Sequence, residues 1–253
     1  MGRGLLRSYP CVIGGIIAVL CTPLLVLAQE KSTVPFIGCP SDGQLGPQEA
    51  PEGANPSVSV SAREAQRLAY YSSAQGISVL APRGWYCFGM YGSGGVELLV
   101  SPQPIKPAAD SVFPVRGFSG PAIVLSYIAG DTSGRFIVAE MIARVFPSRR
   151  AFVTKAMELF DMPTGSIPFG PYPTDTLTYK SETVVEYKTP TDTEGLGTHS
   201  LLGKGDGPIY GAAILVGQTP DLLLLSARLP ADLAELAPAI VRQVESEADR
   251  LSR

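Results

Sequence analysis

His199 is the single histidine of the chain, so any mechanism that needs a histidine base must use it. It lies in LGTHSLLGKGDG, and the serines that could act with it as nucleophiles are Ser93 of GSGG and Ser119 of GFSG. A nucleophile elbow needs G-x-S-x-G between a strand and a helix, and neither serine has that setting. A hydrolase that uses His199 with Ser93 or Ser119 is therefore the alternative function, and an incidental polar histidine is the simpler interpretation.

Residues 80–95, LAPRGWYCFGMYGSGG, concentrate the groups that binding surfaces use. They include the only tryptophan of the chain and place Arg83, Trp85, Tyr86 and Tyr91 around a glycine-rich stretch. Aromatic rings with an arginine are typical of partner surfaces and carbohydrate platforms. The same residues could instead form a hydrophobic plug. We predict a binding site here, and the two alternatives remain open.

Other chemistries lack their motifs. The GKGDG run at residues 203–207 does not follow the phosphate-loop order, and the chain has no G-x-G-x-x-G between a strand and a helix, no H-E-x-x-H and no calcium-binding loop. Glu97, beside the aromatic stretch, is the one carboxylate with a setting that a glycosidase pair could use. A solvent-facing strand residue is the simpler interpretation of Glu97. The sequence therefore predicts no cofactor and no metal site.

The first 28 residues predict export. Arg3 and Arg7 precede an apolar run from Val12 to Ala28, and Glu30 is the first acidic residue. A basic start, an apolar stretch and a small residue at its end are typical of a secretory signal peptide, which would be cleaved after Ala28. The expected location is the bacterial periplasm or the medium. The alternative is an uncleaved membrane anchor formed by residues 12–28.

Cleavage would leave two cysteines, Cys39 and Cys87. An even pair in an oxidising compartment predicts one structural disulfide, which would stabilise the fold by roughly 4 kcal/mol. A redox pair is the alternative, but the spacing is not C-x-x-C.

The charge of the chain argues against nucleic acid as a partner. Without the signal peptide it holds 18 basic and 23 acidic residues, a net charge of −5. Nucleic-acid binders concentrate an excess of lysine and arginine, and no basic cluster is found beyond Arg149 and Arg150. A partner protein or a small ligand is the expected partner.

Periodicity predicts the elements that would position these residues. A capping box at Ser61 and Glu64 begins a helix that ends at Gly76. Phe152, Val153, Ala156, Met157 and Phe160 form one apolar stripe of a later helix and are assigned to the core. The first part of the chain is predicted to form a Pro- and Gly-rich, strand-poor lead over 29–56, a helix over 61–76, and strands over 77–82 and 96–102 joined by a glycine-rich turn. A buried strand over 122–130 and helices over 130–147 and 149–160 follow, and a linker over 162–175 ends this part. The remainder is predicted to form one long half-exposed strand over 176–188, strands over 207–217 and 221–229, and a final helix in which Pro238 kinks or splits off the first turn.

Hairpins followed by helices predict one α+β domain over 57–253, with a mostly antiparallel sheet packed by helices in the manner of an α/β/α sandwich. The P-x-G-W opening at Pro82–Trp85 and the final strand–strand–helix order resemble the PsbP-like proteins, which are α/β/α sandwiches. The resemblance is one of element order, and it implies binding or assembly and not catalysis. The sequence thus predicts an exported, non-enzymatic binding or assembly protein.

Overall fold

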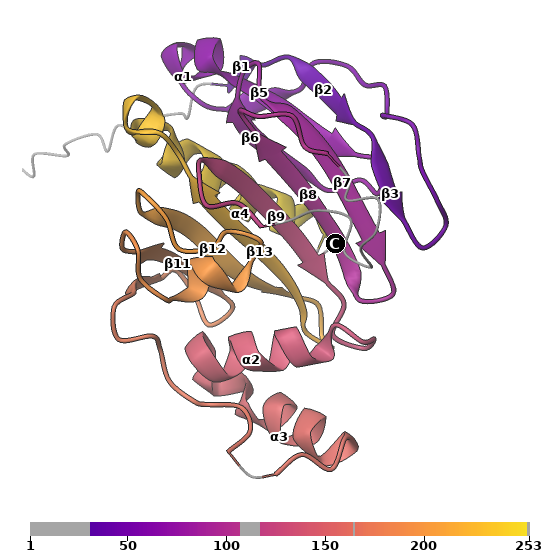
Figure 1. Cartoon of the computed structure of the whole chain (residues 1–253), viewed down its shortest axis with the longest axis vertical. Coiled ribbons are helices and arrows are strands. Elements are labelled where there is room, and N and C mark those ends of the chain that lie inside the picture. Colours follow the sequence, from indigo (N-terminus) through magenta and orange to yellow (C-terminus); the bar gives the residue numbers. More distant parts are fainter. Residues whose placement is uncertain (1–30, 107–116, 164, 252–253) are drawn as a thin grey trace, which may run out of the picture.

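The structure is a computed structural model that describes residues 31–106, 117–163 and 165–251 (Figure 1). The predicted signal peptide and the alternative anchor at residues 12–28 lie outside this part of the chain. No helix within the described residues has the length and apolar character needed to cross a membrane.

An eight-stranded sheet forms the centre of the fold. Its strand order is β10-β11-β12-β13-β9-β8-β7-β3, and every neighbouring pair is antiparallel except β3 with β7. Its strands are β3 (Ser41–Gly43), β7 (Tyr86–Gly92), β8 (Gly95–Ser101), β9 (Ala122–Ile128), β10 (Thr176–Tyr179), β11 (Val184–Thr189), β12 (Ile209–Val216) and β13 (Asp221–Arg228). This arrangement confirms the predicted α+β class with a mostly antiparallel sheet packed by helices.

Each face of the sheet carries its own covering layer. One face packs against α4 and a three-stranded sheet, and the other packs against α2, which carries α3 on its outer side (Figure 1). The covering elements are β2 (Phe36–Cys39), β5 (Leu68–Ser73), β6 (Ser78–Pro82), α1 (Ala62–Arg67), α2 (Arg135–Val145), α3 (Arg150–Leu159) and α4 (Ala237–Leu251), with a small β1 (Lys31–Thr33) and β4 (Ser57–Ser59) pair beside them.

The two hydrophobic layers explain why the central strands read as continuous apolar runs. In β9, Ile123 and Leu125 enter the core on the α4 side, whereas Ala122 and Val124 enter the core on the α2 side. Successive side chains of a strand point to opposite faces, so a strand that is covered on both faces needs apolar residues at every position. The predicted strands at 122–130, 207–217 and 221–229 are confirmed for this reason.

Helix α4 also closes the free edge of β6 through a glutamine. The Gln243 side-chain oxygen accepts a hydrogen bond from the Leu80 N–H at 2.9 Å, and its amide lies 3.4 Å from the Ser78 carbonyl oxygen. A buried backbone group without a partner is costly, so this side chain replaces the strand that β6 lacks on that side. Pro238 falls at the start of α4, after a 3-10 helix over Ala231–Leu236, as predicted.

A buried arginine fastens the loops at the end of β13. Arg228 is 1% exposed, and its guanidinium donates to the carbonyl oxygens of Ser119, Gly203 and Gly207. Burial lowers the pKa of Arg228, and the carbonyl acceptors stabilise its positive charge. The arginine thereby holds the 117–120 and 203–207 segments together.

A disulfide joins the two sheets. The sulfur atoms of Cys39 in β2 and Cys87 in β7 are 2.07 Å apart, which confirms the predicted bond. The prediction of a strand-poor lead is wrong, because β1, β2 and β3 lie within it. The chain passes from the small sheet to the edge of the large sheet at Pro40, where β2 ends and β3 begins.

The helix predicted over residues 61–76 is wrong beyond its first six residues. The capping box is present, since the Ser61 and Glu64 side chains each bond the backbone of the other. The helix ends at Arg67, and Leu68–Ser73 form β5, which pairs with β6. Pairing of the Tyr70 and Tyr71 region with β6 outweighs local helix propensity, because aromatic residues pack well in a sheet.

Two further predictions of strand pairing are wrong. The stretch predicted as a turn between 77–82 and 96–102 contains β7, which pairs with β8, while β6 pairs with β5 in the small sheet. The long strand predicted over 176–188 is instead a hairpin of β10 and β11, with a turn at Ser181–Thr183. The first error comes from reading a glycine-rich stretch as a turn, and the second from an alternation of apolar and polar residues that continues through the turn.

Candidate functional site

Arg83 and Trp85, two of the predicted site residues, hold the β6–β7 corner in place. The Arg83 guanidinium donates to the carbonyl oxygens of Ala65 and Leu68 at the end of α1. The Tyr71 hydroxyl lies 2.8 Å from the Pro82 carbonyl oxygen and 3.2 Å from the Trp85 backbone nitrogen. The half-buried Trp85 ring packs against the core on the α4 side. These contacts favour the plug interpretation for Trp85.

Tyr86 and Tyr91, the other two, occupy different surroundings. Tyr86 is 52% exposed. Tyr91 is half-buried, and its hydroxyl donates to the Gly46 carbonyl oxygen in the loop after β3. Arg83, Trp85 and Tyr91 are thus engaged with other parts of the fold, and Tyr86 remains as the exposed aromatic side chain of the four.

His199 forms its hydrogen bond with a tyrosine and with neither candidate serine. His199 lies at the end of a 3-10 helix over Leu196–His199, and its Nε2 atom shares a hydrogen bond with the Tyr172 hydroxyl. Ser93 shares its hydrogen bonds with Gln44 and Ser133 instead. Among the described residues, no hydrogen bond joins His199 to Ser93 or to Ser119.

Glu97 is more enclosed than a solvent-facing strand residue. Its carboxylate accepts a hydrogen bond from the Ser126 hydroxyl of β9 at 3.1 Å. Burial raises the pKa of Glu97, and the hydrogen bond from Ser126 lowers it by a smaller amount. The described part of the chain contains no group of three or more His, Cys, Asp or Glu side chains arranged to hold a metal ion.

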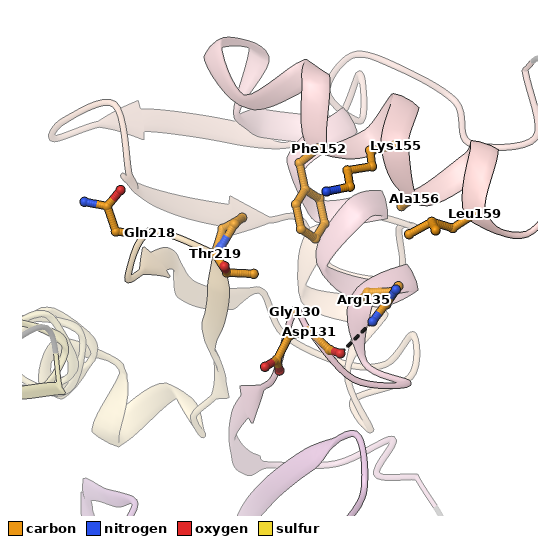
Figure 2. Close-up of a pocket in the computed structure, with 10 residues that line it drawn as sticks. Gly130, Asp131, Arg135, Phe152, Lys155, Ala156, Leu159, Gln218 and Thr219 are labelled. Atoms are coloured by element: carbon orange, nitrogen blue, oxygen red, sulfur yellow. Dashed lines mark hydrogen bonds between the residues drawn. The ribbon is translucent and has the colours of Figure 1, made fainter.

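A pocket of about 340 Å³ lies where α2 and α3 meet the β12–β13 turn (Figure 2). This volume is within the usual range for small-molecule sites. We call it the α2–α3 pocket. It is lined by Gly130, Asp131, Arg135, Phe152, Lys155, Ala156, Leu159, Gln218, Thr219 and Pro220.

An aspartate positions the floor of this pocket. The Asp221 carboxylate, at the start of β13, accepts hydrogen bonds from the Tyr127 hydroxyl and from the Gly130 N–H, the latter at 2.8 Å. Burial, reinforced by the Asp221 contact, raises the pKa of Tyr127 to about 12, so the hydroxyl remains a donor at neutral pH. This pair of bonds holds the end of β9 against the β12–β13 turn.

Glycine is required at position 130 by the close approach that these bonds impose. A Cβ atom added there would lie 2.1 Å from the Pro220 carbonyl oxygen. No side-chain carbon fits at that distance, so only glycine lets the chain pass.

The pocket has an apolar wall and two cations. Phe152, Ala156 and Leu159 come from one side of α3. Arg135 donates to the carbonyl oxygens of Asp131 and Thr132, so backbone and not a carboxylate holds its charge. Within residues 31–106, 117–163 and 165–251, neither Arg135 nor Lys155 forms an ion pair.

Sequence reasoning missed this pocket. It assigned Phe152 and Phe160 to the core. Phe152 is half-buried and packs against the core, but it also lines the pocket, and Phe160 is 51% exposed. Val153 and Ala156 are buried as predicted. The apolar stripe carried no signal of a pocket, because its width is that of an ordinary core-facing side of a helix.

Comparisons with protein-family models, curated proteins and solved structures find no match to this chain.

Replacing Trp85 tests whether it is a plug. We expect Trp85→Ala to lower the free energy of unfolding by about 3 kcal/mol, because a large ring leaves the core. Tyr86→Ala, at an exposed position, is the matched control and should change it by less than about 0.5 kcal/mol. Urea unfolding measures both, and equal effects would rule out the plug interpretation.

Adding one methyl group at Gly130 tests the pocket floor. We expect Gly130→Ala to cost roughly 2 kcal/mol of stability, since its Cβ must displace the Pro220 carbonyl. Gly120→Ala is the control, because a Cβ at Gly120 meets no atom within 4 Å. Thermal unfolding of the two variants measures the difference, and a Gly130→Ala protein as stable as Gly120→Ala would contradict the described geometry.

Proposed function

We propose that this chain is an exported binding protein that takes an organic anion in the α2–α3 pocket. The single observation that carries the proposal is the pairing of an apolar wall with two cations that form no ion pair with any carboxylate in the described part of the chain. Small-molecule sites are mostly apolar with a few polar groups that fix the orientation of the ligand. A free cation in such a site favours a negatively charged group on the ligand.

Non-enzymatic binding is favoured over hydrolysis by the surroundings of His199. A serine hydrolase needs its histidine within hydrogen-bond reach of the nucleophile, and the hydrogen bond of His199 goes to Tyr172 instead. Nucleic acid is an unfavourable partner for a chain with a net charge of −3.

Export to the periplasm or the medium is supported by two features. The pattern of residues 1–28 is that of a signal peptide. The bond between Cys39 and Cys87 suits an oxidising compartment, where disulfides form and persist.

An anionic fluorescent probe tests the proposed binding. We expect 8-anilinonaphthalene-1-sulfonate to bind the native protein with one site, and Lys155→Glu to weaken binding at least about tenfold through charge reversal. Lys204→Glu is the matched control, an exposed lysine outside the pocket. Fluorescence titration gives the Kd values. The proposal fails if Lys155→Glu and Lys204→Glu bind the probe equally well.

Thiol counting tests export. The full chain, expressed in bacteria with a C-terminal tag, should be recovered outside the cytoplasm with Gln29 as its first residue. Maleimide should label no thiol in the denatured, non-reduced chain and two thiols after reduction, because Cys11 and Cys21 leave with the signal peptide. Two additional thiols in a membrane fraction would indicate the uncleaved anchor, and a cytosolic chain with its first residues intact would contradict export.

A further inference from the structure

The side of α3 that lines the pocket carries three apolar residues and one charged residue. Phe152, Lys155, Ala156 and Leu159 follow one another at helical spacings of three, one and three residues, which places them on one side of the helix (Figure 2). Lys155 thus lies between apolar side chains and carries the only charge on this strip of the helix. A ligand that contacts the strip must offer both an anionic group and apolar surface.

Apolar surface continues past the pocket at the end of α3. Leu159 is 56% exposed and Phe160 is 51% exposed. The Phe160 ring packs on Phe136, with ring centroids 4.4 Å apart, and the Arg135 guanidinium lies 5.9 Å from the Phe160 ring centroid. A ligand that is held by Arg135 or Lys155 therefore has uncovered apolar surface within reach, and covering that surface is favourable.

The polar groups of the pocket select the sign of the charge on the ligand. Asp131 is the only acidic residue among those that line it, against the two cations. Gln218 and Thr219 are exposed on the opposite rim. The Thr219 hydroxyl can donate a hydrogen bond to an anion there, whereas the Gln218 amide points away from the other lining side chains (Figure 2). A cationic head group would meet two cations, Lys155 and Arg135, against the single carboxylate of Asp131.

We infer that the ligand of the α2–α3 pocket is a single-chain anionic amphiphile. Its acidic head group pairs with Lys155, beside Arg135, and its alkyl chain lies over Leu159 and Phe160. The volume of about 340 Å³ is at the lower end of the range for ligand pockets, which suits one alkyl chain and not two. This inference rests on the proposed function and names the class of ligand.

Titration calorimetry with alkyl carboxylates of increasing length tests the inference. Butyrate, hexanoate, octanoate and decanoate are used below their micelle concentrations. We expect affinity to rise with length, by about fourfold for each methylene that becomes buried, and by at least about tenfold from butyrate to decanoate. Decanol and decyltrimethylammonium, which keep the chain and lose or reverse the charge, should bind at least about tenfold more weakly than decanoate.

Two variants separate the contribution of the ligand head group to the affinity from that of the ligand's alkyl chain. Lys155→Glu should weaken decanoate and butyrate alike, because both carry the carboxylate. The Leu159→Ser, Phe160→Ser double variant should reduce the dependence on chain length, with decanoate weakened more than butyrate. Tyr179→Ser is the control, since Tyr179 is 54% exposed on β10 and does not line the pocket.

The outcomes distinguish this inference from the proposed function. Equal affinities for butyrate and decanoate, both lost in Lys155→Glu, would support an anion site and overturn the amphiphile. No binding of any carboxylate, together with no binding of the sulfonate probe, would overturn both. Binding to phosphatidylglycerol vesicles without binding of monomeric decanoate would overturn the inference in favour of a membrane surface as the partner.

Discussion

The hydrogen bonds of the Asp221 carboxylate are the interaction on which the α2–α3 pocket depends. This carboxylate lies at the start of the central strand β13 and accepts hydrogen bonds from the Tyr127 hydroxyl and the Gly130 N–H of the neighbouring strand end. Because Gly130 has no Cβ, the chain passes against the Pro220 carbonyl and turns directly into α2. The position of α2, and of α3 packed on it, follows from this corner. The pocket is therefore built on the rigid end of the sheet and not on a free loop.

The rest of the molecule stabilises the sheet on which that corner is built. Both faces of the large sheet are covered, and the disulfide, Gln243 and Arg228 each join elements that are distant in sequence. The bonding groups of all three have their partners inside the fold. They therefore stabilise the structure and have no free group to offer to a ligand. Arg135 and Lys155 differ because both line a pocket that a ligand could enter, and neither forms an ion pair among the described residues. That difference is the reason for placing the proposed function at α2 and α3.

The sequence was informative where one local signal decides the structure. Continuous apolar runs predicted β9, β12 and β13, and the Ser61 capping box predicted the start of α1. It failed where pairing with a distant strand decides, as at Leu68–Ser73, which pair with β6 instead of extending the helix. The pocket could not be predicted because its lining comes from three separate segments, 130–135, 152–159 and 218–220. The Asp221 hydrogen bonds and the packing of α3 on α2 bring these segments together.

A crystal structure of the chain with decanoate tests the central claim most directly, because it locates head group and alkyl chain at once. The account predicts the carboxylate within about 4 Å of the Lys155 Nζ atom and the alkyl chain over Leu159. Decanoate bound at Tyr86 or elsewhere, with the α2–α3 pocket empty, would contradict it.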